Sequence, residues 1–136
     1  MTTLLDGNVL VALSFVFHTH ARSADLWFAG LSDTFSTCPI TEGTLVRQAL
    51  RDGLSADEAK AVLSKFTNHS HHVFWPDVVA YRDVRMDGVV GHRQVTDAYL
   101  AQLARHYEGR LATFDEGLAA LHDDVAELIP TEKGGR

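Results

Sequence analysis

Short apolar segments alternate with amphipathic helical stretches along the whole chain, and this alternation restricts the possible folds more than any other feature. Strands are predicted over residues 3–5, 34–38, 72–75, 110–114 and 125–129. Helices are predicted over residues 9–13, 24–31, 39–52, 55–66, 77–84 and 94–107, with a short one after residue 115. This alternation predicts an α/β fold, a doubly wound parallel sheet flanked by helices on both faces.

The length and composition fit one globular domain. The chain has 136 residues, of which 46% are hydrophobic and 22% charged, as is usual for a single folded unit. We expect the domain to cover residues 1–130 and residues 131–136 to form a short flexible C-terminal tail. Cys38 is the single cysteine, so no internal disulfide can form. The sequence shows no membrane-spanning stretch and no signal peptide, which together with the lone cysteine predicts a cytoplasmic protein.

The chain is acidic, with a formal net charge of -6 when its histidines are neutral. This charge argues against a protein that coats nucleic acid, because such proteins are usually basic. It leaves open an enzyme whose bound cations offset a local acidic cluster. The position of the acids therefore matters more than their number.

Two predicted strands end in an aspartate where the chain turns into a helix. Asp6 follows the strand at residues 3–5, and Asp115 follows the strand at residues 110–114. The carboxyl ends of parallel strands meet at one edge of a sheet, where folds of this class bind ligands. Each aspartate is also a favoured helix N-cap, which is a purely structural role. Both interpretations stay open for either residue taken singly.

Glu42 and Asp97 occupy the first turns of two later predicted helices. Glu42 lies four residues before Val46 and Asp97 three residues before Leu100, so each acid borders the apolar stripe of its helix. The helix dipole stabilises an acid in the first turn by only about 0.3–1 kcal/mol, and the alternative role is that of a ligand. Because these helices begin at the carboxyl edge of the sheet, all four acids can converge there.

Four carboxylates at one edge would repel one another strongly. At about 4 Å and an effective dielectric constant near 20, each pair costs roughly 4 kcal/mol, so such a cluster takes up protons or binds a cation. Oxygen ligands suit Mg²⁺ or Mn²⁺. A cation at this edge favours phosphodiester hydrolysis, because it polarises a phosphoryl oxygen and activates water. The pattern fits one ion or two.

Four segments in a fixed order resemble a known protein family. They are residues 4–10 (LLDGNVL), 38–42 (CPITE), 91–100 (GHRQVTDAYL) and 111–115 (LATFD). Together they resemble the VapC toxins of bacterial toxin–antitoxin systems, which are PIN-domain ribonucleases. The resemblance covers nearly the whole chain, and its most specific part is the long segment that ends in Thr-Asp-Ala-Tyr-Leu.

The resemblance implies a complete functional assignment. The family's metal ligands correspond to Asp6, Glu42, Asp97 and Asp115. In the same family, Asn8 matches a polar position that supports the first aspartate, and Thr113 matches a small hydroxyl residue before the last one; Glu116 is a further candidate acid. The implied activity is Mg²⁺- or Mn²⁺-dependent cleavage of RNA. The implied partners are a second copy in a homodimer and a VapB-type antitoxin, for which part of the first helical pair would line a groove.

Several other polar residues have two interpretations. Arg93 and Arg47 each lie near a candidate acid in the sequence, and a guanidinium suits contact with RNA phosphate. A salt bridge or a solvated position is the alternative for each arginine. The cluster of His69, His71 and His72 lacks further ligands at zinc spacing. We interpret this cluster as an exposed loop that leads into a strand.

Two other functional classes compete with the nuclease. The first is a module that binds RNA or protein without turnover, although such a module has no need for all four acids. The second is a phosphoacceptor receiver domain, which is also doubly wound. A receiver requires two adjacent acids after its first strand and a lysine after a late strand, whereas this chain has Asp6 alone and no lysine near Asp115.

Overall fold

The computed structural model describes residues 1–131, and it contains the predicted parallel sheet. The strands are β1 (Thr3–Leu5), β2 (Phe35–Thr37), β3 (His72–Phe74), β4 (Arg110–Thr113) and β5 (Ala126–Leu128). They lie in the order β3-β2-β1-β4-β5, and every neighbouring pair is parallel. All five carboxyl ends therefore meet at one edge. The tail predicted at residues 131–136 lies, apart from Thr131, outside the described residues.

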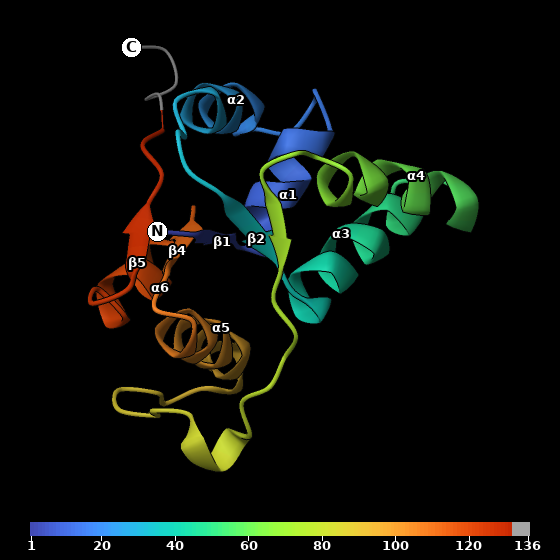
Figure 1. Cartoon of the computed structure of the whole chain (residues 1–136). Coiled ribbons are helices and arrows are strands. Elements are labelled where there is room, and N and C mark those ends of the chain that lie inside the picture. Colours follow the sequence, from blue (N-terminus) through green and yellow to red (C-terminus); the bar gives the residue numbers. More distant parts are fainter. Residues whose placement is uncertain (132–136) are drawn as a thin grey trace.

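Helices cover both faces of this sheet, as predicted. They are α1 (Gly7–Ser14), α2 (Ala21–Ala29), α3 (Pro39–Arg51), α4 (Ala56–Thr67), α5 (Val95–His106) and α6 (Glu116–Leu121). Figure 1 shows α5 and α6 on one side of the strands and α1 and α2 on the other, with α3 and α4 beside α1. No helix within residues 1–131 is both long and apolar enough to cross a membrane.

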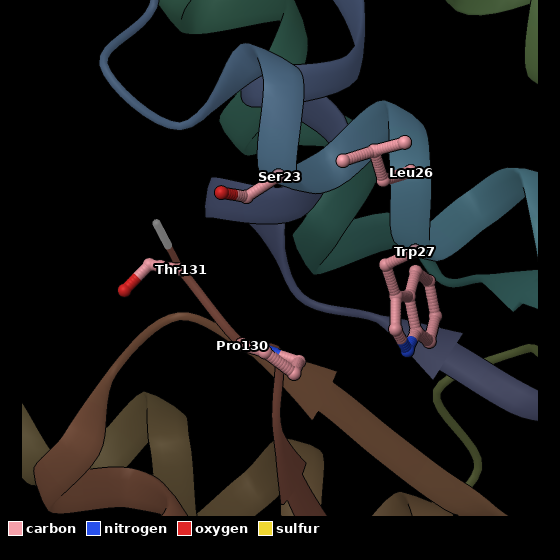
Figure 2. Close-up of a pocket in the computed structure, with 5 residues that line it drawn as sticks. All are labelled: Ser23, Leu26, Trp27, Pro130 and Thr131. Atoms are coloured by element: carbon pink, nitrogen blue, oxygen red, sulfur yellow. The ribbon is translucent and has the colours of Figure 1, made fainter. Parts of the chain in front are cut away.

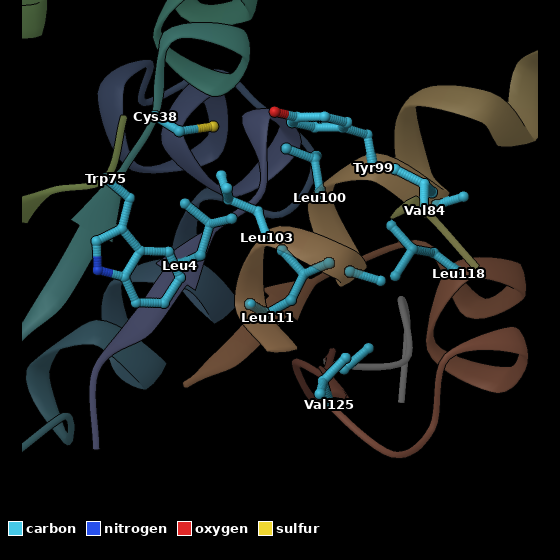
Figure 3. Packing of buried hydrophobic residues seen from close by; sticks show 14 residues of the cluster. Leu4, Cys38, Trp75, Val84, Tyr99, Leu100, Leu103, Leu111, Leu118 and Val125 are labelled. Carbon is cyan, nitrogen blue, oxygen red and sulfur yellow. The ribbon is translucent and has the colours of Figure 1, made fainter. Parts of the chain in front are cut away.

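The central strand β1 is apolar on both faces because both faces are covered. Successive side chains of a strand point to opposite faces. Leu4 accordingly packs with Leu103 and Leu111 on the α5 side, in the cluster drawn in Figure 3. Leu5 packs with Leu10 and Phe35 on the α1 side. The continuous apolar sequence of β1 therefore builds two cores and delivers the following residue, Asp6, to the carboxyl edge.

The helix predicted over residues 77–84 is wrong. The structure has only a short 3₁₀ turn there, at Tyr81–Asp83, within a long connection that ends in a second 3₁₀ turn at His92–Gln94. Two tyrosines of the α5 region capture carbonyl groups of this connection: the hydroxyl of Tyr99 donates to Val79 at 2.8 Å, and that of Tyr107 donates to Pro76 at 3.0 Å. These tertiary bonds take the place of the helical ones that local sequence favoured.

Candidate metal centre

Asp6 follows the last residue of β1 and is held by two hydrogen bonds. Its Oδ1 accepts the backbone N–H of Gly7 at 2.8 Å, and its Oδ2 accepts the hydroxyl of Thr113 at 2.7 Å. Burial raises the pKa of Asp6, the two hydrogen bonds oppose that rise, and the charge of Asp115 adds to it. The two hydrogen bonds therefore offset only part of the cost of burying the ionised Asp6 carboxylate.

Thr113 joins the ends of β1 and β4. Besides donating to Asp6, its hydroxyl accepts the backbone N–H of Asp115 at 3.0 Å. Asn8 adds two longer bonds, in which Nδ2 donates to Thr113 at 3.4 Å and Oδ1 accepts the N–H of Phe114 at 3.3 Å. Because the Thr113 side chain is fully buried, this network ties Asp6 to the turn that carries Asp115. Asn8 and Thr113 thus lie where a supporting role requires them.

Asp115 and Asp97 reach the same edge from α6 and α5. Asp115 is the N-cap of α6, and its Oδ1 accepts the N–H of Leu118 at 3.0 Å. Asp97 lies in the first turn of α5. Burial raises the pKa of Asp97 from 3.8 to about 6, and the charges of Asp6 and Asp115 contribute to the rise. The three carboxylates are therefore within electrostatic reach of one another, as expected for acids that converge on one site.

A pocket of 160 Å³ opens beside two of these acids. It is lined by Arg93, Gln94, Asp97, Asp115, Gly117, Leu118 and Leu121. Arg93 is exposed on the 3₁₀ turn that leads into α5, so a guanidinium shares the wall of this pocket with the two aspartates. Arg47 is exposed on α3, five residues after Glu42, and Glu116 is exposed as the first residue of α6. Neither of these two lines the pocket.

Glu42 occupies the end of the neighbouring strand, in the first turn of α3. Its Oε2 accepts the hydroxyl of Thr37 at 2.6 Å, and the same hydroxyl oxygen lies 2.7 Å from Nε2 of His72. Burial lowers the pKa of His72, and the charge of Glu42 opposes that effect. The structure thus places Asp6, Asp97 and Asp115 close enough for the charge of Asp115 to affect the pKa values of the other two. It places Glu42 on the adjacent strand end, bonded to Thr37.

The donor set fits a hard divalent cation. Within residues 1–131, no three side chains of Asp, Glu, His or Cys already surround a common point as they do in a formed metal site. The acids nevertheless lie at the ends of β1, β2 and β4 and in the first turn of α5. They supply only oxygen, the ligand type that Mg²⁺ and Mn²⁺ prefer. Their mutual repulsion, which adds to the effect of burial in raising the pKa of Asp97, would be relieved by a cation bound among them.

Figure 2 shows a different pocket, of 340 Å³, between α2 and the segment after β5. It is lined by Ser23, Leu26, Trp27, Pro130 and Thr131. None of these residues is an acid or a histidine, so this pocket offers no ligands of the kind found at the carboxyl edge.

Comparison with known proteins establishes the family. The PIN-domain profile matches residues 3–123 of this chain. Ribonuclease VapC29 of Mycobacterium tuberculosis is 55% identical over 131 residues, which cover 96% of this chain and 98% of VapC29. The chain belongs to the VapC family of PIN-domain proteins. The resemblance found in the four sequence segments is thereby confirmed, and the receiver-domain alternative is wrong.

Solved structures share the fold of this PIN domain. VapC20 of Mycobacterium tuberculosis, a sarcin–ricin loop cleaving toxin, superposes with a TM-score of 0.73 at 14% identity, covering 94% of this chain and 99% of the VapC20 chain. VapBC2 of Rickettsia felis, bound to a DNA fragment from its promoter, superposes with a TM-score of 0.67 at 15% identity, covering 96% of this chain and 100% of the matched chain. These likenesses confirm the PIN-like parallel sheet.

Sequence reasoning missed two residues beside the acids of this PIN domain. Thr37 was not singled out, and His72 was placed in an exposed loop with His69 and His71. The structure confirms the predicted strand that begins at His72, but the His72 side chain is partly buried and bonded to Thr37, whereas His69 and His71 are exposed as expected. The available signal was the β-strand register: His72 begins one predicted strand, and Thr37 lies near the end of the neighbouring one.

Proposed function

We propose that this protein is a Mg²⁺- or Mn²⁺-dependent endoribonuclease that hydrolyses RNA phosphodiester bonds. The observation that carries the proposal is the convergence of Asp6, Asp97 and Asp115: burial raises the pKa of Asp97 to about 6, and the charges of Asp6 and Asp115 add to that rise. The VapC relatives are named ribonucleases, which supports the same reaction class. A cluster of this kind suits phosphodiester hydrolysis. A cation bound there would offset the repulsion among the carboxylates and would activate a water molecule.

Four acids of this chain would hold the cation: Asp6, Asp97, Asp115 and, from the adjacent strand end, Glu42. When bound, the cation would polarise the phosphoryl group and lower the pKa of the attacking water. The remaining tasks belong to the protein. Thr113 donates to Asp6 and orients its carboxylate toward the edge. The helix cap made by Asp115 fixes one of its oxygens and leaves the second for a ligand.

Arg93 is the residue best placed to bind the phosphate of the RNA. It lines the same pocket as Asp97 and Asp115, and a guanidinium matches phosphate oxygens with two parallel N–H donors. We expect Arg93→Gln to raise the KM for RNA while leaving Mn²⁺ affinity nearly unchanged. Arg47 is a more distant candidate for the same strand of RNA. If Arg93 were instead a structural partner of the aspartates, Arg93→Gln would alter metal affinity and stability, with KM unaffected.

The reaction is tested with purified protein, a mixed RNA substrate and Mn²⁺ or Mg²⁺. We expect cleavage that stops when EDTA is added and in Asp6→Asn. Asp57→Asn is the matched control, because Asp57 is exposed on α4, away from the site, and this variant should cleave normally. Cleavage that survives both EDTA and Asp6→Asn would refute the metal-dependent mechanism. Retention of RNA without cleavage across several metals would favour the alternative of a binding module.

We further propose that the protein acts in the cytoplasm as the toxin of a toxin–antitoxin pair. A groove of 240 Å³ lies where α1, α2 and α4 meet; Leu13, Phe28 and Val62 are among its lining residues, and Asp25 and Lys65 supply charge. This groove suits an apolar segment of a VapB-type antitoxin. The antitoxin should suppress cleavage by the wild type and fail to suppress cleavage by Val62→Glu. Equal inhibition of the wild type and Val62→Glu would mean that the antitoxin binds another surface.

The proposed homodimer is tested separately, by light scattering on the purified protein. A mass near twice the 15.0 kDa of the chain is expected. A monomeric mass across the concentrations used for the cleavage assay would contradict the homodimer without affecting the nuclease proposal.

A further inference from the structure

Two short hydrogen bonds connect His72 to Glu42 through the hydroxyl of Thr37. Thr37 Oγ1 donates to Glu42 Oε2 at 2.6 Å and lies 2.7 Å from Nε2 of His72. Thr37 ends β2 and is fully buried, whereas His72 begins β3 and is partly buried. The parallel register pairs His72 with Phe35, and Thr37 follows Phe35 on the same face of β2. The imidazole therefore extends along the strands toward the carboxyl edge.

The direction of each hydrogen bond follows from the chemistry of the three groups. An ionised carboxylate only accepts hydrogen bonds, and a hydroxyl has a single hydrogen to donate. The Thr37 hydrogen is therefore committed to Glu42, at a distance typical of a charge-assisted bond. The second bond then requires His72 to donate from Nε2 to the Thr37 oxygen. Both bonds run in the same direction, from imidazole to hydroxyl to carboxylate, so each polarises the other.

Packing also holds the imidazole of His72 in place. Its ring lies edge-on to that of Phe35, with centroids 5.4 Å apart and planes inclined by 62°. Phe35 is almost completely buried, so it is a rigid support. His71, one residue earlier, is exposed, and its ring contacts that of His69. His72 is bonded to Thr37, whereas His71 is exposed and makes no such bond. His71 is therefore a matched control.

We propose that His72 positions the carboxylate of Glu42 for a divalent cation by acting through the Thr37 hydroxyl. This inference rests on the proposed function, in which Glu42 is a metal ligand. An unrestrained glutamate loses side-chain conformational entropy when it is immobilised on a ligand. The bond from Thr37 fixes Oε2 beforehand and leaves Oε1 for the cation. Hydrogen-bonding partners of metal ligands typically change metal affinity by about 10–100-fold.

Calorimetric titration of the whole protein with Mn²⁺ tests this proposal. His72→Ala should weaken binding about tenfold, at the lower end of the usual range because His72 acts through a second residue. His72→Gln should restore most of the affinity, since its amide can donate from a nitrogen near the position of Nε2. The control His71→Gln should bind as the wild type does. Wild-type affinity in His72→Ala, or equal losses in His72→Ala and His72→Gln, would overturn the proposal.

Thr37 supplies a second measurement, because it is the link between the two groups. Thr37→Val should weaken Mn²⁺ binding at least as much as His72→Ala. Adding His72→Ala to Thr37→Val should then cost little more, since the imidazole no longer reaches Glu42. This is a double-mutant cycle, and additive losses would mean that the two residues act independently. Additivity would therefore overturn the proposal.

Nitrogen NMR of the histidine side chains gives a readout that needs neither metal nor activity. The bonding direction requires the proton of neutral His72 on Nε2. A neutral His72 protonated on Nδ1 would contradict the bonding direction and, with it, the proposal. The Nε2 form should lose its preference in Thr37→Val, whereas the tautomer of His71 should not change.

Glu42→Gln distinguishes failure of this inference from failure of the proposed function. If Glu42→Gln binds Mn²⁺ as the wild type does while Asp6→Asn does not bind it, the positioning role is wrong and the metal centre remains without Glu42. If the wild-type protein itself binds no Mn²⁺, the proposed function fails, and the positioning role fails with it.

Discussion

Replacing Asp97 by asparagine should stabilise this protein in the absence of metal. At neutral pH the carboxylate of Asp97 is ionised, although burial and the charges of Asp6 and Asp115 oppose ionisation. Asparagine has nearly the same shape and no charge. Asp97→Asn therefore removes an unfavourable charge from the folded state and leaves the packing of α5 intact.

The size of the effect follows from the raised pKa. A rise from 3.8 to about 6 corresponds to about 3 kcal/mol, at roughly 1.36 kcal/mol for each pKa unit. The side chain is half-buried, so screening by solvent reduces the net effect to on the order of 1 kcal/mol. For a domain of this size, 1 kcal/mol moves Tm by roughly 3–5 °C. Asp97→Asn should therefore melt a few degrees above the wild type in EDTA.

The pH dependence gives the sign of the effect. A carboxyl group with a raised folded-state pKa favours folding fully below its unfolded pKa of 3.8, and this contribution is lost as pH rises through about 6. The wild type is therefore at its greatest disadvantage above about pH 7. The advantage of Asp97→Asn should be constant there and should shrink as pH falls from about 6 toward 4.

Urea unfolding in EDTA at pH 7.5 and pH 5.0 measures both effects. Asp123→Asn is the control that should match the wild type at both pH values, because Asp123 is exposed and lies in a turn rather than in a helix. Under the proposed function, addition of Mn²⁺ should reverse the order, because the wild type would bind the ion and gain stability by mass action while the variant would bind it weakly. An Asp97→Asn protein that is less stable than the wild type in EDTA at pH 7.5 would refute the reasoning. An advantage that does not narrow at pH 5.0 would refute it equally.

Three further substitutions test individual contacts. Thr113→Val keeps the shape of a fully buried side chain but removes the donor to Asp6; it should cost about 1–3 kcal/mol in urea unfolding and weaken Mn²⁺ binding, and unchanged values would show the bond to be dispensable. Gly109→Ala would bring a Cβ into steric conflict with the carbonyl oxygen of Thr2, so overpacking of about 1–3 kcal/mol should lower Tm, and an unchanged Tm would contradict this close approach. Ser55→Ala removes the hydroxyl that caps α4 and should cost about 1 kcal/mol in urea unfolding, whereas Ser55→Asp should retain the cap and the stability.

The sheet and the two strand-end aspartates could be predicted because their signals are local. A short apolar run such as residues 3–5 that is followed by a helix-capping aspartate favours a buried strand ending at the sheet edge, because the segment is too short for a buried helix. The helix predicted at residues 77–84 failed for the opposite reason. The groups that hold this segment, the hydroxyls of Tyr99 and Tyr107, come from later in the chain, and local propensity contains no information about them.

The position of Glu42 shows where prediction from sequence stops. Helical spacing correctly put Glu42 at the start of α3 and at the carboxyl edge, because that depends on residues within two turns. Spacing does not specify which partner binds the carboxylate. The bond to Thr37, and through it to His72, depends on the pairing of β2 with β3 across a separation of 35 residues. Only the fold brings these groups together.

The capping role and the ligand role of the strand-end aspartates prove to be compatible. Asp6 accepts the N–H of Gly7 with Oδ1, and Asp115 accepts that of Leu118 with Oδ1, so both caps are real. A carboxylate has about four acceptor positions on two oxygens, and a cap occupies one of them. Because asparagine is as good a cap as aspartate, asparagine variants remove the charge that a cation needs and retain the helix start. Alanine variants would remove both, and a loss of activity in them could not be assigned to the metal.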